Sequence, residues 1–284
     1  MPKTCYLCNS PDFKTRKGQV RDAPELKILE CKTCGLVTLS SLDHIQPGHY
    51  EQSGMHGDEP PSIEHLLRQT ACDDERRFKL LKSVLPNKRV LDFGCGNGGF
   101  MLRAAELCKT IVGVELEARV RNYWGTRLTI VPDLENAGGG YDIITAFHVV
   151  EHLCNPLETL VQLKQALNPK GRMIVEVPSS DDALLTLYDC RAFQHFTYWS
   201  QHLFLFNAET LRQLARKAGL EVIAMDQFQR YPLSNHLYWL SQGKPGGHDR
   251  WSFLDSSELN QAYANALGSV GHCDTLIAYL GHEK

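Results

Sequence analysis

The stretch that decides the fold is Val90-Leu-Asp-Phe-Gly-Cys-Gly-Asn-Gly-Gly-Phe100. A short apolar run leads directly into a loop that contains Gly94, Gly96 and Gly98, and a helix-forming segment follows. Glycines let the backbone turn sharply and approach a ligand closely. The spacing is G-x-G-x-G, whereas loops that cradle a pyrophosphate at a helix N-terminus carry G-x-G-x-x-G. Asp92 precedes the loop and would repel phosphates, so the stretch predicts a ligand-binding turn that is not a dinucleotide site.

Short apolar runs alternate with helical segments on both sides of this turn. Alternation of this kind predicts an α/β fold with a doubly wound, mostly parallel sheet and helices on both faces. The expected strands are residues 90–93, 111–114, 128–131, 143–147, 173–177, 221–225 and 275–280, which makes a seven-stranded sheet. The expected helices are residues 62–85, 99–107, 156–167 and 207–218, with another near 233–240.

Further candidate ligand contacts follow the next strands of this pattern. Glu115, with Leu116, ends the second strand, where an acid can accept both hydroxyls of a ribose. Asp133, with Leu134, follows the third strand, where a carboxylate can accept the exocyclic amine of an adenine. Phe147 ends the fourth strand. Because the carboxyl ends of parallel strands meet at one edge, these residues predict a nucleoside site there.

Two Cys-x-x-Cys pairs, Cys5 with Cys8 and Cys31 with Cys34, bracket a short polar segment. Four thiolates in this arrangement are typical of a structural zinc site, and a segment this short needs a metal to supply its stability. The alternatives are four unliganded thiols or a redox pair, but a redox motif normally has a single pair. The chain is therefore expected to comprise a zinc ribbon (1–40), a linker and helical lid (41–85) and the α/β domain (86–284) with an insertion at 226–274.

The glycine loop, Glu115, Asp133 with Leu134, and the segment Phe147-His-Val-Val-Glu-His152 together resemble the class I S-adenosylmethionine-dependent methyltransferases. The resemblance implies that the glycine loop lies against the methionine part of the cofactor, that Glu115 holds the ribose and that Asp133 faces adenine. It also implies that the chain is an enzyme. Asp92 suits a cationic sulfonium, which carries no phosphate.

Three further features place the resemblance in a smaller group of methyltransferases: the ribbon ending in Cys34-Gly-Leu-Val, a linker containing Tyr50, and His202 before a helix. Together they are similar to the zinc-ribbon methyltransferases of bacterial polysaccharide and natural-product gene clusters. This implies a small-molecule acceptor, a sugar or sugar-nucleotide, methylated on oxygen or carbon. In the C-methyltransferases an acid usually precedes the second-loop histidine and a large C-terminal domain follows. Here Gln201 takes the place of the acid, and the 284 residues are not expected to include that domain, so O-methylation is expected at least as much as C-methylation.

Methyl transfer requires in-line positioning and a base for the acceptor proton, and histidine titrates near neutral pH. His202 or His152 is the expected base, while Tyr198 and Glu151 are expected to orient the acceptor or the base. A metal at the segment from His148 to His152 is a further alternative, as is a capping role for these residues. The insertion is expected to form a substrate lid or a dimer contact.

The composition restricts the partners. The net charge is −3, and no Lys- or Arg-rich stripe extends beyond the ribbon, so nucleic acid is not the expected partner. No apolar run near Met1 or elsewhere predicts a signal peptide or membrane helix, and a cytoplasmic monomer or homodimer is expected. The rival functions are an RNA methyltransferase that grips nucleic acid with its ribbon, and a non-catalytic module that binds the nucleoside.

Overall fold

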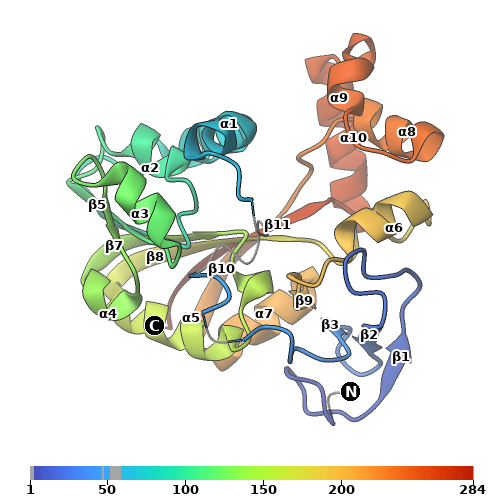
Figure 1. The fold of residues 1–284 in the computed structure, drawn as a ribbon, viewed down its shortest axis with the longest axis horizontal. Helices are drawn as coiled ribbons and strands as arrows, with labels where there is room; N and C mark the ends of the chain where they lie inside the picture. Colours follow the sequence, from blue (N-terminus) through green and yellow to red (C-terminus); the bar gives the residue numbers. More distant parts are fainter. Residues whose placement is uncertain (1–2, 47, 52–58, 284) are drawn as a thin grey trace.

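A computed structural model describes residues 3–46, 48–51 and 59–283 of the chain. Residues 47 and 52–58, which belong to the predicted linker, lie outside the described residues. The described part contains a seven-stranded sheet covered by helices on both faces, a small N-terminal sheet beside it, and a group of helices at one end (Figure 1).

The large sheet has the strand order β10-β11-β8-β7-β4-β5-β6. β4 pairs in parallel with β5 and β7, while β11 is antiparallel to both of its neighbours. Its strands are β4 (Arg89–Phe93), β5 (Thr110–Val114), β6 (Thr129–Val131), β7 (Tyr141–Phe147), β8 (Leu167–Pro178), β10 (Leu220–Phe228) and β11 (Thr275–His282). The predicted doubly wound, mostly parallel seven-stranded sheet is therefore confirmed.

Helices cover both faces of this sheet, as a parallel arrangement requires. Figure 1 shows α1 (Ile63–Leu81), α2 (Gly99–Ala104) and α3 (Ala118–Trp124) on one face, and α4 (Leu134–Ala137), α5 (Pro156–Ala166) and α7 (Ala208–Lys217) on the other. β4 runs between these layers, so Val90 and Leu91, whose side chains point to opposite faces, are both fully buried. Helices α1 and α2 are shorter than predicted, and residue 167 begins β8 instead of ending a helix.

The N-terminal sheet consists of β1 (Phe13–Thr15), β2 (Ile28–Cys31) and β3 (Val37–Leu39), and it is completed by β9 (Phe204–Leu205) from the α/β part of the chain. β3 pairs with β9 in antiparallel register, with Val37 opposite Leu205. The Thr38 hydroxyl adds a hydrogen bond of 3.0 Å to the carbonyl of Leu203. Backbone pairing across the two parts fixes the ribbon against the loop that precedes α7.

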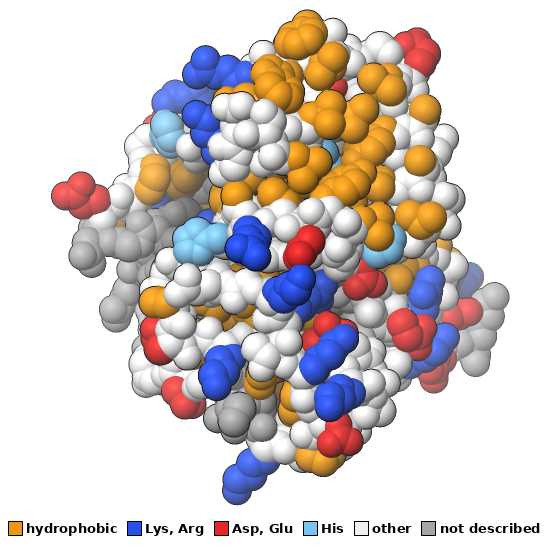
Figure 2. Space-filling model, turned by 90° about the vertical axis from the view of Figure 1, so that its right-hand side faces the viewer, with side chains coloured by type: hydrophobic (Ala, Val, Ile, Leu, Met, Phe, Trp, Pro, Cys, Tyr) orange, Lys and Arg blue, Asp and Glu red, His pale blue; other side chains and the backbone are white. Residues whose placement is uncertain are grey.

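The late insertion forms helices α8 (Leu233–Gln242), α9 (Gly247–Arg250) and α10 (Ser257–Val270), so the helix expected near 233–240 is present. They lie near α6 (Arg191–Thr197) at one end of the sheet (Figure 1). Figure 2 shows hydrophobic side chains gathered on the upper part of the molecule in this view, and acidic and basic side chains interspersed over the lower part. Leu237, Leu240 and Phe253 are among the exposed apolar side chains of the insertion. Among the described residues, no helix combines the length and apolar character needed to span a bilayer.

Candidate active site

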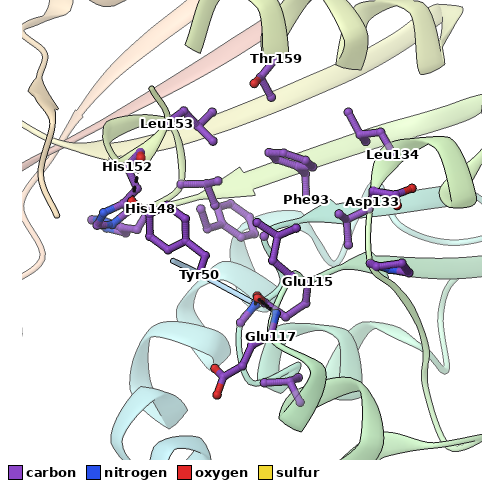
Figure 3. A pocket seen from close by; sticks show the side chains of 18 of the residues that line it. Tyr50, Phe93, Glu115, Glu117, Asp133, Leu134, His148, His152, Leu153 and Thr159 are labelled. Carbon is purple, nitrogen blue, oxygen red and sulfur yellow. Dashed lines mark hydrogen bonds between the residues drawn. The ribbon is translucent and has the colours of Figure 1, made fainter. Parts of the chain in front are cut away.

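A cavity of about 440 Å³ opens at the carboxyl ends of β4, β5 and β7. Figure 3 shows Asp133 and Leu134 at one end of it, His148 and His152 at the other, and Glu115 in between. Most of the residues predicted to bind the nucleoside line this cavity: Gly94, Gly96, Glu115, Leu116, Asp133, Leu134 and Phe147. Asp92 and Gly98 are outside its lining. The strand ends thus bring together residues that are far apart in the sequence.

Glu115 links the end of β5 to the glycine loop. One carboxylate oxygen accepts a hydrogen bond of 3.0 Å from the backbone N–H of Gly96, and the other accepts one of 2.9 Å from the N–H of Glu117. Burial raises the pKa of Glu115 despite these hydrogen bonds. The two bonds hold the carboxylate in one orientation at the middle of the cavity.

Asp92 lies beneath the loop, with a side chain only 3% exposed. Its carboxylate accepts a hydrogen bond of 2.7 Å from the Thr145 hydroxyl on the neighbouring strand β7. Burial raises the pKa of Asp92 to about 7. The residue predicted to face the cofactor is therefore buried and lies outside the lining of the cavity.

All three glycines of the loop have positive φ angles, which disfavour any side chain. A Cβ at Gly98 would lie 2.8 Å from the indole nitrogen of Trp124, and that nitrogen donates a hydrogen bond of 2.8 Å to the carbonyl of Asn97. A Cβ at Gly96 would meet nothing within 4 Å. Gly98 is therefore needed for packing of the loop, whereas Gly96 leaves space open at the cavity.

Asp133 caps α4 at the far end of the cavity. Its Oδ1 atom accepts hydrogen bonds of 2.8 Å from both the backbone N–H and the side-chain amide of Asn136. Asn136 and its N–H lower the pKa of Asp133, so the carboxylate stays ionised. Asp133 also lines the cavity, so its carboxylate can meet a ligand there.

A buried network closes the opposite end of the cavity. The ring of His148, which has a φ of 55°, lies 3.0 Å from a carboxylate oxygen of Glu151 and 3.2 Å from one of Glu176. Glu176 also accepts hydrogen bonds of 2.8 Å from both Arg76 and Arg77. Burial opposes a charge on His148, but the two carboxylates outweigh it and raise its pKa. This network fixes the loop that follows β7.

A second cavity of about 310 Å³ meets the first at His148, which lines both. Its walls carry aromatic rings, histidines and arginines from the ribbon, α6, the loop before β9 and the insertion. They include Arg21, Phe193, Phe196, Trp199, His202, Arg230, Tyr231 and His236. The guanidinium of Arg21 lies 4.6 Å from the ring centroid of Trp199, so the ribbon contributes a cation to this cavity.

His152 and His202, the two predicted bases, lie together where these cavities meet. Their ring centroids are 5.1 Å apart. Burial lowers the pKa of His152 and lowers that of His202 to about 4, so both rings are neutral near pH 7. Glu151 is fully buried beside them. The structure brings these three predicted residues into one cluster.

Tyr198 does not join this cluster. Its side chain lies beside Gly18 of the ribbon, and it lines a separate cavity with Arg16 and Lys17. Its ring is so close to Gly18 that a Cβ there would be 2.6 Å from it. The structure therefore places Tyr198 at the junction with the ribbon and away from the two histidines.

The four ribbon cysteines have sulfur atoms within 4.8 Å of one another. Cys5 and Cys34 are 3.6 Å apart, and Cys8 and Cys31 are 3.5 Å apart. Four sulfurs bound tetrahedrally at about 2.3 Å would be separated by about 3.8 Å, so this cluster fits zinc. Burial opposes ionisation of Cys31, but backbone N–H groups and Cys8 outweigh it and lower its pKa to about 7.

Sequence reasoning missed several residues of the site. Tyr50 from the linker lines the first cavity and donates a hydrogen bond of 2.9 Å to the carbonyl of His152. Glu176, Arg21 and Arg230 were also not identified. Glu176 carried a signal, because an acid inside an apolar strand of a buried sheet needs a partner. Arg230 lies in the insertion that was expected to form a substrate lid or a dimer contact, whereas no local pattern indicated Arg21.

Comparisons with known proteins agree with this geometry. Residues 64–225 match the family described as methyltransferase domain. A ubiquinone biosynthesis O-methyltransferase of Dinoroseobacter shibae is 33% identical over 197 residues, covering 62% of this chain and 76% of that protein. A tRNA U34 carboxymethyltransferase of Azotobacter vinelandii is 29% identical over 161 residues, covering 50% and 48%.

Among solved structures, a SAM-dependent methyltransferase from Archaeoglobus fulgidus superimposes with a TM-score of 0.50 at 17% identity, covering 77% of this chain and 94% of that one. This likeness supports the fold, and the family match covers more than half of the chain. The strand order, the glycine loop and the acids after β5 and β6 agree with the same family. The chain therefore belongs to the methyltransferase-domain family and is a class I S-adenosylmethionine-dependent methyltransferase.

Proposed function

We propose that this methyltransferase transfers the methyl group to a hydroxyl of a small, anionic, carbohydrate-like acceptor such as a sugar nucleotide. The observation that carries the proposal is the second cavity, which joins the cofactor cavity at His148. Its aromatic walls can pack against an apolar sugar face, and its arginines can pair with a phosphate. Arg21 brings the ribbon into acceptor recognition.

The residues that would hold S-adenosylmethionine lie in the order of its chemical parts. Asp133 and Leu134 would contact adenine at one end, and Glu115 would accept hydrogen bonds from the ribose hydroxyls. Gly94 and Gly96 would lie along the methionine part. This direction points the reactive methyl group toward His148 and His152, where the second cavity begins.

His152 and His202 are proposed to assist the loss of the acceptor proton. Each has its Nδ1 atom hydrogen-bonded to a backbone carbonyl, at 2.7 Å from Gln201 and 2.9 Å from Thr197. Since burial keeps both rings neutral, each Nε2 atom presents a lone pair. Such a lone pair can accept a proton directly or bind a cation.

An anionic acceptor agrees with the charges of the second cavity. The guanidinium of Arg21 stacks on Trp199 and donates a hydrogen bond of 3.1 Å to the carbonyl of Phe196. Arg230 is paired with Asp73. Burial raises the pKa of the two acids in this cavity, Asp182 and Asp274, which reduces their repulsion of an anion. Arg21 is thus the arginine best placed to pair with a phosphate.

The ribbon cysteines are proposed to bind a structural zinc ion. Zinc would fix the turn between β2 and β3, and the pairing of β3 with β9 would extend this order to the loop that carries His202.

Oxygen is the favoured acceptor atom, because Gln201 stands where C-methyltransferases usually have an acid. The Dinoroseobacter relative, named as an O-methyltransferase, supports the same preference.

The experiment begins with calorimetry of the purified full chain and S-adenosylhomocysteine, which should bind. Transfer of labelled methyl from S-adenosylmethionine is then measured with a panel of sugar nucleotides, free sugars and phenols. Methyl transfer to a sugar nucleotide by the wild type would support the acceptor class. The Arg21→Ala variant should then methylate the same acceptor with a higher KM and a similar kcat. Labelling of phenols alone would contradict it.

RNA methylation is the second candidate, because relatives include tRNA U34 carboxymethyltransferases. The second cavity, of about 310 Å³ and continuous with the cofactor cavity at His148, favours a small molecule. A salt-sensitive shift of tRNA by the full chain, together with methyl incorporation into that tRNA, would favour RNA instead.

A further inference from the structure

We propose that Glu151, His152 and His202 form a second metal site that binds a divalent transition-metal ion. One ligand atom from each side chain can be chosen such that all three lie within 4.8 Å of one another. Two imidazole nitrogens and one carboxylate oxygen are a ligand set used by catalytic zinc and by non-haem iron. This site lies in the α/β part of the chain and is separate from the ribbon cysteines.

Both histidines are held in the tautomer that a metal ligand requires. The Nδ1 atom of His152 lies 2.7 Å from the carbonyl oxygen of Gln201, and that of His202 lies 2.9 Å from the carbonyl oxygen of Thr197. A carbonyl can only accept, so each Nδ1 carries the hydrogen and each Nε2 carries a free lone pair. Metal-binding histidines almost always donate their second ring N–H in this way.

The carboxylate of Glu151 has one oxygen engaged and one without a partner. Oε1 lies 3.0 Å from Nδ1 of His148, which orients the group. Oε2 is buried and has no hydrogen-bond partner among the described residues. Leaving a charged oxygen buried and unpaired costs free energy, and a bound cation would supply the missing interaction.

The surrounding charges are compatible with a cation. The guanidinium groups of Arg76 and Arg77 both pair with Glu176, each at 2.8 Å. Glu176 therefore balances their charge, and the carboxylate of Glu151 keeps one buried oxygen without a hydrogen-bond partner in the described part of the chain to face a cation. The backbone N–H of Leu203 donates a hydrogen bond of 2.9 Å to the carbonyl of Glu151, which ties the loops carrying the three ligands to one another.

The position of the site indicates how the metal would be used, and this use rests on the proposed function. His152 lines the cofactor cavity and His202 lines the second cavity, so a cation between them would have open positions at their junction. An acceptor hydroxyl bound there would lose its proton to water more readily, because the cation lowers the pKa of that hydroxyl. Its oxygen would then form the bond to the methyl carbon as the carbon–sulfur bond breaks, and that electron pair would remain on sulfur.

The test measures zinc in the full-length protein after loading with Zn²⁺ and dialysis against metal-free buffer. The wild type should retain about two equivalents, one in the ribbon and one in this site. Glu151→Gln and His202→Gln should each retain about one equivalent, since both remove a ligand while preserving size. His195→Gln is the matched control, because His195 is exposed on nearby α6 and should leave the content unchanged.

A Cys31→Ser variant should keep the second ion, and adding Glu151→Gln to it should remove that ion. X-ray absorption at the zinc edge of Cys31→Ser should show nitrogen and oxygen ligands without sulfur. Wild-type protein that retains only the ribbon zinc, with Glu151→Gln unchanged, would overturn the proposal. S-adenosylhomocysteine binding by every sample shows that it is folded. Loss of that binding in the wild type would instead refute the proposed function.

Discussion

The imidazole rings of His152 and His202 lie with their centroids 5.1 Å apart, although one follows β7 and the other precedes β9. The contact depends on the loop at His202 being held from both sides. β9 pairs with β3 of the ribbon, and Leu203 bonds to the backbone of Glu151. The ribbon is therefore part of the scaffold that positions the two histidines.

Glu115→Ala is expected to weaken S-adenosylhomocysteine binding by about 10- to 100-fold. Hydrogen bonds to a charged group contribute about 1.5–3 kcal/mol, and the variant removes the carboxylate that is proposed to hold the ribose. Isothermal titration calorimetry measures the change. Glu135→Ala is the control, because Glu135 is exposed on neighbouring α4 and should bind like the wild type. Equal affinities for the Glu115 variant and the wild type would refute this placement of the ribose.

Cys31→Ser is expected to lower the unfolding temperature while leaving cofactor affinity within a few fold. The cysteine cluster supplies order to the ribbon, whereas the cofactor cavity is built by β4, β5 and β7. Thermal unfolding and calorimetry of the same samples separate the two effects. A chelator strong enough to strip zinc should lower the unfolding temperature of the wild type toward that of the variant. A large direct loss of cofactor binding would contradict a purely structural role.

Asp92→Asn is expected to make the folded state more stable at pH 8 and to change little at pH 4. Burial raises the pKa of Asp92 from an ordinary value of 3.8 to about 7, so the native state binds a proton that the unfolded chain releases. The associated stability is present below pH 4 and is lost as the pH rises toward 7. A pKa difference of about three units corresponds to at most about 4 kcal/mol of folding stability. The wild type loses this stability when Asp92 ionises, whereas the side-chain amide of the variant stays neutral and loses none.

Urea unfolding across this pH range measures the effect. Asp142→Asn is a control of opposite sign, because the N–H of Arg89 and the amide of Asn168 lower the pKa of Asp142. Its contribution is present above the unfolded pKa and is lost as the pH falls, so this variant should be less stable at neutral pH. Stability of Asp92→Asn that parallels the wild type at all pH values would show that Asp92 is not titrating as described.

Gly98→Ala is expected to destabilise the protein by about 2–4 kcal/mol, because the new methyl group meets Trp124 and the backbone has a positive φ. Gly271→Ala is the matched control: its φ of 78° is nearly that of Gly98, at 79°, and a Cβ there meets nothing within 4 Å. The control should cost only about 1 kcal/mol, from the backbone term alone. Denaturant unfolding gives both values, and equal losses would exclude the steric contribution of Trp124.

Much of the fold could be predicted because its strands and helices are specified by patterns within contiguous segments of sequence. The apolar run before Gly94 specifies β4, and the alternation that follows specifies a parallel sheet. Residues such as Glu115 and Asp133 could be assigned to one site, because parallel strands present their carboxyl ends at one edge. Element ends were predicted less well: α2 was expected to extend to residue 107 and ends at Ala104.

By itself, the sequence determined the sheet, the glycine turn and the two Cys-x-x-Cys pairs, because each depends on neighbours within a few residues or on a fixed strand order. Only the tertiary structure decided that Tyr198 lies beside the ribbon, that Arg21 enters the second cavity and that His202 meets Glu151. These contacts join segments far apart in the chain. Their formation depends on β3 pairing with β9 and on shared burial, for which no local pattern exists.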